Sequence, residues 1–343
     1  MSNSQPCVIA CSATGGRFPM MVGILDYLEN EILRPLGYEP LRIGSSGGTL
    51  AAMARTITEP GEDSVWWLEK VTKVSGVAKI GGVKLPLNIW NLCMHGGLLA
   101  SHKLLPTLEH LIEGPHRNGS TAACMFSVSS RYEARILLDP KVLTSEQITK
   151  FVAASMSLQF AISPTEILNR DLPVWLQKKW GVVDHPDNFS VCSDGGTGSY
   201  LPVSLRGLHW NVPAGTPVIG IALDPVGIAQ YRPEGLVGNT LQGGNPISKI
   251  WKGCWSVVAA NSNEDWEKAV ADNNVHPSFL FTVPTPKHLE KYELRFDHTF
   301  EEAMEMFEYG YMEAKRKLKF PLPGTENETL DEVLANLFGK EIK

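Results

Sequence analysis

The sequence predicts an α/β fold in which a mainly parallel central sheet is covered by helices on both faces. Three observations in the first part of the chain support this prediction. Short apolar runs are typical of buried strands, segments with helical spacing lie between them, and small residues mark the points where strand changes to helix. Strands that alternate with helices form parallel sheets, because a crossover must carry the chain back before the next strand begins.

The first four elements follow in order. Residues 7–11 form an apolar run that predicts a buried strand, and residues 41–44 predict a second one. Residues 19–33 carry apolar side chains at helical spacing, and residues 47–57, rich in Ala, Leu and Met, predict the next helix. These segments make a strand–helix–strand–helix unit, which is the start of a parallel sheet covered by helices.

The rest of the chain resumes this alternation after a less regular stretch at 62–105, which we interpret as an excursion from the sheet. Thr144 and Gln147 form a capping box that predicts a helix at 144–155. The other predicted elements are strands at 122–129, 134–138, 191–193, 218–223 and 279–283, a tight turn at 130–133, and helices at 299–318 and 329–338. No linker divides the chain, so we expect a single domain over 1–343, with a core at about 6–320 and a short extension at 321–343.

The composition argues against several classes of function. Hydrophobic residues make up 43% of the 343 residues and charged residues 20%, which is typical of a packed globule. The net charge is −6, so we expect no nucleic-acid partner, because such a partner requires a positive field. The sequence has neither an apolar run of about 18 residues nor a signal-peptide pattern at its start. We therefore expect a cytoplasmic protein that meets membranes only at their surface.

The six cysteines and nine histidines lack the spacing of a metal site. No cysteines are paired as C-x-x-C, and no histidines follow H-x-x-x-H or H-E-x-x-H. Most of the cysteines lie in apolar, strand-like runs, so we expect reduced thiols in the core, with one or two disulfides as the alternative. The sequence predicts no metal and no cofactor.

A serine motif lies where the second predicted strand meets the second predicted helix. Ser46 stands between Gly44 and Gly48 in the pattern G-x-S-x-G. A serine on such a sharp turn projects its hydroxyl from the carboxyl edge of the sheet, beside the positive end of the helix dipole. The alternative is a phosphate-binding turn, but no lysine follows Gly48 and no G-x-G-x-x-G is present.

Two other segments supply the partners that a nucleophilic serine needs, namely a base and hydrogen-bond donors for the oxyanion. Asp194 ends a predicted strand and is followed by two glycines, so we expect it at the same carboxyl edge as Ser46. Gly15 and Gly16 follow the first strand, and their N–H groups can face a ligand because no Cβ blocks them. Taken singly, an Asp–Gly turn and a turn that begins a helix remain the alternatives.

Together these segments resemble the patatin-like phospholipase family over roughly residues 6–320. The similarity follows the family's order: a glycine-rich loop with a basic residue at 13–18 and then Gly-Ile-Leu at 23–25, the G-x-S-x-G turn at 44–48, an Ala-Ser stretch at 154–164, Asp-Gly-Gly at 194–196, and Gly-Tyr at 310–311. The chain departs from the family at Ala13, Thr14 and Phe18, where glycines are usual, and at Gln159, where proline is usual. It is thus similar to a divergent member.

The resemblance implies a catalytic dyad rather than a triad. Ser46 would attack an ester carbonyl, and Asp194 would take its proton and later activate water. N–H groups near Gly15 and Gly16 would hold the oxyanion, with Arg17 as a helper. The implied activity is that of a phospholipase A or lysophospholipase acting on a phospholipid or another lipid ester, with peripheral contact at membranes.

Other functions remain open at this level. A general carboxylesterase or an acyltransferase would use the same dyad, and a catalytically inactive lipid-binding module would retain the fold without the activity. An α/β-hydrolase with a histidine base is disfavoured because the serine motif comes early in the chain. Residues 172–180 interleave Trp175 and Trp180 with lysines, which suits a membrane interface. The alternative there is a surface helix whose tryptophans enter the core.

Overall fold

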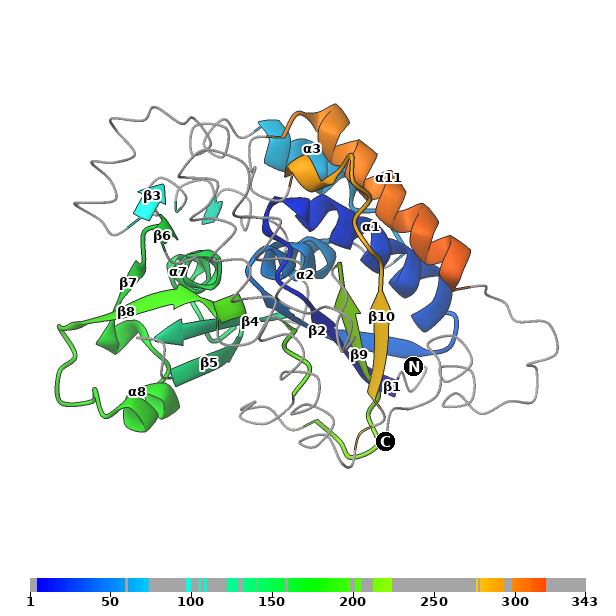
Figure 1. The fold of residues 1–343 in the computed structure, drawn as a ribbon. Coiled ribbons are helices and arrows are strands. Elements are labelled where there is room, and N and C mark those ends of the chain that lie inside the picture. Colours follow the sequence, from blue (N-terminus) through cyan, green and yellow to red (C-terminus); the bar gives the residue numbers. More distant parts are fainter. Residues whose placement is uncertain are drawn as a thin grey trace, which may run out of the picture.

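The computed structural model describes residues 5–58, 61–73, 97–99, 105, 108–109, 122–128, 132–139, 141–157, 160–197, 201–204, 212–223, 276, 278–292 and 298–318. Most of the predicted excursion at 62–105 lies outside these residues. So do the helix predicted at 329–338, Gln159, and residues 130–131 of the turn predicted at 130–133, whereas residues 132–133 of that turn belong to a strand. The described elements form an α/β fold on a mainly parallel central sheet with flanking helices, which confirms the predicted fold class (Figure 1).

The central sheet has eight strands in the order β10-β9-β1-β2-β4-β8-β7, with β5 paired to β4. Five strands run parallel, namely β1 (Gln5–Cys11), β2 (Tyr38–Ser45), β4 (Ala122–Val128), β9 (Val218–Ala222) and β10 (Ser278–Thr282). Three strands pair antiparallel, namely β5 (Tyr132–Leu137), β7 (Thr165–Leu168) and β8 (Phe189–Asp194). Every residue from Cys7 to Cys11 is buried, so both faces of the central strand are covered. A separate parallel pair joins β3 (Gly97–Leu99) to β6 (Phe160–Ile162).

The helices follow the predicted periodicity closely. Helix α1 (Phe18–Tyr27) continues as the π-helix η2 (Leu28–Leu33), so the predicted helix at 19–33 is present with a wider second half. The next two helices are α2 (Gly47–Ile57) and α7 (Ser145–Met156), and the predicted capping box of Thr144 and Gln147 begins α7. The other α-helices within the described ranges are α3 (Val65–Lys73), α8 (Val174–Trp180) and α11 (Phe300–Lys317).

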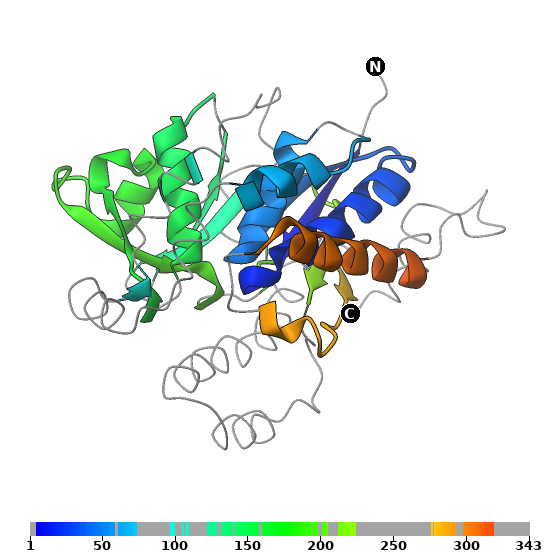
Figure 2. The same cartoon turned by 90° about the horizontal axis from the view of Figure 1, so that it is seen from above.

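The helices form layers on the sheet. Helix α1 packs against α2, and α2 packs against α7. Helix α11 lies along the outer side of α1, as Figure 2 shows, and a second capping box, of Thr299 and Glu302, begins it. In Figure 1, α7 lies above strands β4 and β8, whereas α8 lies below β5 and β8.

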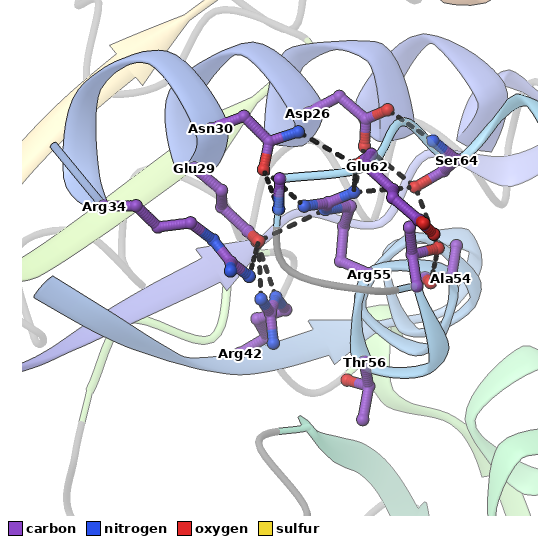
Figure 3. Close-up of polar contacts among 12 residues, drawn as sticks. Asp26, Glu29, Asn30, Arg34, Arg42, Ala54, Arg55, Thr56, Glu62 and Ser64 are labelled. Atoms are coloured by element: carbon purple, nitrogen blue, oxygen red, sulfur yellow. Dashed lines mark hydrogen bonds and ion pairs between the residues drawn. The ribbon is translucent and has the colours of Figure 1, made fainter. Parts of the chain in front are cut away.

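A buried ionic cluster joins the first helix to the two elements that flank Ser46 (Figure 3). The carboxylate of Glu29, in η2, accepts two hydrogen bonds of 2.5 Å from Arg42 of β2 and one of 3.2 Å from Arg55 of α2. Arg55 also lies 2.8 Å from Asp26, whose carboxylate accepts hydrogen bonds from the N–H and hydroxyl of Ser64. Glu29 therefore holds β2 and α2 to the same point of the first helix.

The two carboxyl groups of the cluster differ in pKa. Burial would raise the pKa of Glu29, but the attraction of Arg42 and Arg55 outweighs it and holds the pKa below its usual range. Burial dominates at Asp26 and raises its pKa to about 6, although Arg55 and Ser64 act in the opposite direction. Glu29 therefore stays ionised to a lower pH than Asp26 does.

Helices α1 and α11 approach each other at two glycines. A Cβ on Gly23 would lie 2.1 Å from the carbonyl oxygen of Phe307, and a Cβ on Gly310 would lie 2.1 Å from the carbonyl oxygen of Met20. Both obstacles are backbone atoms, so no side-chain rotation can make room. The two helices therefore pack closely because each presents a glycine to the other's main chain.

We expect Gly310→Ala to destabilise the protein by about 1–3 kcal/mol, because the added methyl forces the two helices apart. At an ordinary helix position, a Gly→Ala substitution stabilises the protein instead, because alanine is more favourable than glycine in a helix by roughly 1 kcal/mol. Urea unfolding measures the change, with Met312→Ala, at an exposed position of the same helix, as the control. A higher urea midpoint for Gly310→Ala than for the unsubstituted protein would contradict the close approach.

Candidate active site

Ser46 occupies the sharp turn between β2 and α2 in a strained backbone conformation. Its φ is 54° and its ψ is −128°, and it is the only non-glycine residue with positive φ in the part of the chain that the structure describes. Such a conformation is costly for a residue with a Cβ and is found mainly where function requires it. The predicted strand–turn–helix context of the G-x-S-x-G pattern is therefore present.

The glycines of this turn are required by close backbone contacts. A Cβ on Gly44 would lie 2.4 Å from the N atom of Thr49, and a Cβ on Gly48 would lie 2.3 Å from the carbonyl oxygen of Ser12. Both distances are far below any real contact of a methyl group with backbone. Gly44 and Gly48 thus allow α2 to begin directly against β2 and against the end of β1.

Asp194 reaches the same place by a route different from the predicted one. We expected its strand to end at the carboxyl edge beside the parallel strands, but β8 runs antiparallel to β4. Strand β5 occupies one edge of β4 over Ala123–Val128, so β2 and β8 must share the other edge. Strand β2 pairs with residues Ala122–Met125 of β4, and β8 pairs with the residues that follow, Phe126–Val128.

The two strands therefore run toward each other along one edge of β4, and their carboxyl ends meet. Strand β2 ends at Ser45, opposite Met125, and β8 ends at Asp194, opposite the next residue of β4, Phe126. In Figure 1 the arrow of β8 points toward the centre of the sheet. This convergence, rather than a common strand direction, brings Asp194 beside Ser46.

The Asp194 carboxyl group is buried, with 1% of the residue exposed. Its Oδ1 accepts a hydrogen bond of 2.6 Å from the N–H of Gly196. Burial raises the pKa of Asp194 to about 7, and the hydrogen bonds from the Ser46 side chain and the Gly196 N–H offset this only in part. The side chain is thus in contact with the Ser46 hydroxyl and changes its charge near neutral pH.

The predicted oxyanion loop presses directly against this pair. A Cβ on Gly47 would lie 2.3 Å from the carbonyl oxygen of Gly15, and a Cβ on Gly196 would lie 2.9 Å from the Cβ of Ala13. Three loops that are far apart in the sequence therefore meet at one place. The loop after β1 carries Gly15 and Gly16, and the turn after β2 carries Ser46. The third loop begins at Asp194, the last residue of β8.

Within this loop, the backbone N–H groups differ in availability. Gly15 adopts a φ of 56°, and the N–H of Arg17 donates to the carbonyl oxygen of Thr14 at 3.2 Å. Among the residues that the structure describes, the N–H groups of Gly15 and Gly16 donate to no backbone acceptor outside the 3₁₀ turn Gly15–Arg17. These two N–H groups are the ones that could bind an anion beside Ser46.

Arg17 supports the loop through its side chain. Its guanidinium is buried and donates to the Thr285 hydroxyl at 2.7 Å and to the Thr14 carbonyl oxygen at 3.3 Å. These contacts tie the loop to the segment that follows β10. The oxyanion role that the resemblance implied for Arg17 stays a prediction. His298, 282 positions from Gly16, has its Nε2 2.7 Å from the Gly16 carbonyl oxygen. No feature of the sequence indicated this contact, because the two segments meet only in the folded chain.

Other features bear on cofactors and membranes. No group of three or more His, Cys, Asp or Glu side chains in the described ranges could hold a metal ion, and none of the helices described there could span a bilayer. Cys7, Cys11 and Cys192 are free, buried thiols, as expected. Trp175 and Trp180 of α8 are partly buried and pack against the hydrophobic core, which favours the core alternative for this helix.

Comparisons with known proteins do not assign a family. No protein-family model matches the chain, and no curated protein matches it. The crystal structure of VipD from Legionella pneumophila is similar over 89% of this chain and 67% of that chain, at 9% sequence identity and a TM-score of 0.29. A similarity this low carries no argument about function.

Proposed function

We propose that this protein is a serine hydrolase that cleaves carboxylic esters with a dyad of Ser46 and Asp194. The observation that carries the proposal is the strained Ser46, with φ of 54°, whose hydroxyl contacts a buried aspartate with a pKa of about 7. A serine is a weak nucleophile unless a base takes its proton. An aspartate with the usual pKa of about 4 is a poor base, whereas one near 7 suits proton transfer at neutral pH.

The proposed reaction has two stages. Asp194 accepts the Ser46 proton while Oγ attacks the ester carbonyl, and the N–H groups of Gly15 and Gly16 stabilise the oxyanion. Collapse of this intermediate breaks the bond to the leaving alcohol, which takes the proton back from Asp194 and leaves an acyl group on Ser46. Asp194 then takes a proton from a water molecule that attacks the acyl-enzyme. It returns this proton to Ser46 Oγ as the bond to the acyl group breaks and the acid is released.

The substrate class that we propose is a lipid ester, of the phospholipase A or lysophospholipase type. This finer assignment rests on the sequence resemblance given above. Such substrates lie in membranes or micelles, so peripheral contact with lipid is part of the proposal. Hydrolysis of short-chain p-nitrophenyl esters without hydrolysis of phosphatidylcholine vesicles or lysophosphatidylcholine would favour a general carboxylesterase instead. Transfer of the acyl group to an added alcohol would favour an acyltransferase.

We expect a fluorophosphonate probe to label the protein at Ser46, because only a serine activated by a base reacts with it. Mass spectrometry of the labelled peptide locates the site, and Ser46→Ala is expected to abolish both labelling and ester hydrolysis. Heat-denatured protein serves as the control, since unfolding separates Ser46 from Asp194. A folded protein that neither reacts with the probe nor hydrolyses any ester would instead fit an inactive binding module.

A further inference from the structure

The C-terminal turn of α7 contacts both members of the proposed dyad. The backbone N–H of Ser46 donates to the Ser155 hydroxyl at 3.2 Å, and the Thr49 hydroxyl lies 2.8 Å from the same Ser155 oxygen. Two residues further on, the carbonyl oxygen of Ser157 accepts a hydrogen bond of 2.9 Å from the backbone N–H of Asp194. One short segment, Ser155–Ser157, therefore binds the main-chain N–H groups of both Ser46 and Asp194.

The contact with Ser155 falls at the strained residue itself. With φ at 54°, Ser46 leaves the strand geometry of β2, so its N–H cannot continue the ladder and needs another acceptor. The Ser155 hydroxyl supplies that acceptor from a fully buried position, and Thr49, in the first turn of α2, orients it. Removal of the Ser155 oxygen would leave the Ser46 N–H without this bond in the core.

The C-terminal turn of α7 is also held by contacts that do not involve Ser46. The Ser157 hydroxyl lies 2.8 Å from both the Ala153 carbonyl oxygen and the Thr165 hydroxyl, so it holds the end of α7 to β7. Strand β7 pairs in turn with β8, where Thr165 is the register partner of Cys192. The turn is thus anchored to the strand that carries Asp194 while Ser155 reaches across to Ser46.

We propose that Ser155 is a positioning residue that holds the Ser46 main chain in the reactive conformation and so sets the placement of its hydroxyl against Asp194. The inference rests on the proposed function, because it assigns Ser155 a role in the same site. Ser155 acts through the Ser46 main chain, whose N–H it binds. Its removal should slow the attack by Ser46 and leave substrate binding unchanged.

The test compares Ser155→Ala with Thr149→Val, which removes another buried hydroxyl of α7. Within the described part of the chain, this hydroxyl donates to the Ser145 carbonyl oxygen of the same helix. We expect Ser155→Ala to reduce the rate of fluorophosphonate labelling and kcat by roughly 10²-fold, with KM unchanged. Thr149→Val should label and turn over like the unsubstituted protein. A purely structural role for Ser155 predicts a lower urea midpoint with an unchanged labelling rate per folded molecule, and that result would overturn the inference.

A second variant covers the case in which Ser155→Ala fails to fold. Ser155→Cys keeps the shape of the side chain but replaces the hydroxyl with a weak hydrogen-bonding group, so it should fold and still label at least roughly tenfold more slowly. If Ser155→Cys is labelled at the rate of the unsubstituted protein, the positioning role of Ser155 is refuted while the proposed function still stands. Failure of the unsubstituted protein to label at Ser46 would refute the proposed function, so the two failures are distinguishable.

Discussion

Asp194→Asn is expected to lower ester hydrolysis by roughly 10⁴-fold while the protein remains folded, because the amide cannot take the Ser46 proton. An asparagine has the same shape and can still accept the hydrogen bond that Gly196 donates at 2.6 Å. The loss should therefore appear in kcat and in the rate of fluorophosphonate labelling. The residual rate should match that of Ser46→Ala, since the two side chains act as one unit.

The pH dependence of the unsubstituted protein identifies the group. Only the ionised carboxylate is a base, so kcat/KM should rise with pH and level off above an apparent pKa of about 7. A profile that levels off near the ordinary aspartate pKa of about 4 would show that burial does not tune Asp194. Activity in Asp194→Asn comparable to that of the unsubstituted protein would remove this residue from the mechanism.

The same variant should be more stable than the unsubstituted protein above neutral pH. The pKa of Asp194 rises from 3.8 to about 7 on folding, so the folded state holds a proton that the unfolded state has lost between these values. The stability that Asp194 contributes is fully present below pH 3.8 and is lost as the pH rises to about 7. Over this range the free energy of unfolding falls by up to about 1.4 kcal/mol per pH unit. Urea unfolding at about pH 8 should therefore give a higher midpoint for Asp194→Asn.

Glu29→Gln is expected to destabilise the protein by about 3–5 kcal/mol, because it leaves Arg42 and Arg55 buried without their shared counter-charge. Glu29, Arg42 and Arg55 are between 0 and 3% exposed, so water cannot replace the carboxylate. The cluster holds β2 and α2, the two elements that meet at Ser46, to the first helix (Figure 3). We expect Glu29→Gln to lose activity and stability together.

The matched control is Glu69→Gln, which removes an exposed carboxylate paired with Lys73 on α3. Exposed pairs contribute at most about 1 kcal/mol, so this variant should unfold at nearly the same urea concentration as the unsubstituted protein. An equal, small effect of both substitutions would mean that the buried cluster does not hold the fold together.

Several parts of the site could be predicted from the sequence because they depend on short-range constraints. The Ser46 turn is visible as glycines between an apolar run and a helix of small residues, since only that pattern allows the close contacts at Gly44 and Gly48. The capping box at Thr144 is likewise a relation between residues three positions apart. Apolar periodicity indicated most strands and helices because it reports which side chains are buried.

The sequence by itself thus determined the α/β class, the strained Ser46 turn, and the glycine-bearing segments at 15–16 and 194–196. Only the tertiary structure decided how these parts meet. It showed that β8 runs against β2 along one edge of β4, that Arg17 bonds to Thr285, and that Ser155 bonds to Ser46. The apolar periodicity of the sequence indicates that a side chain is buried. It does not indicate which residue that side chain contacts or in which direction its strand runs. Those are decided by packing between segments separated by a hundred or more residues.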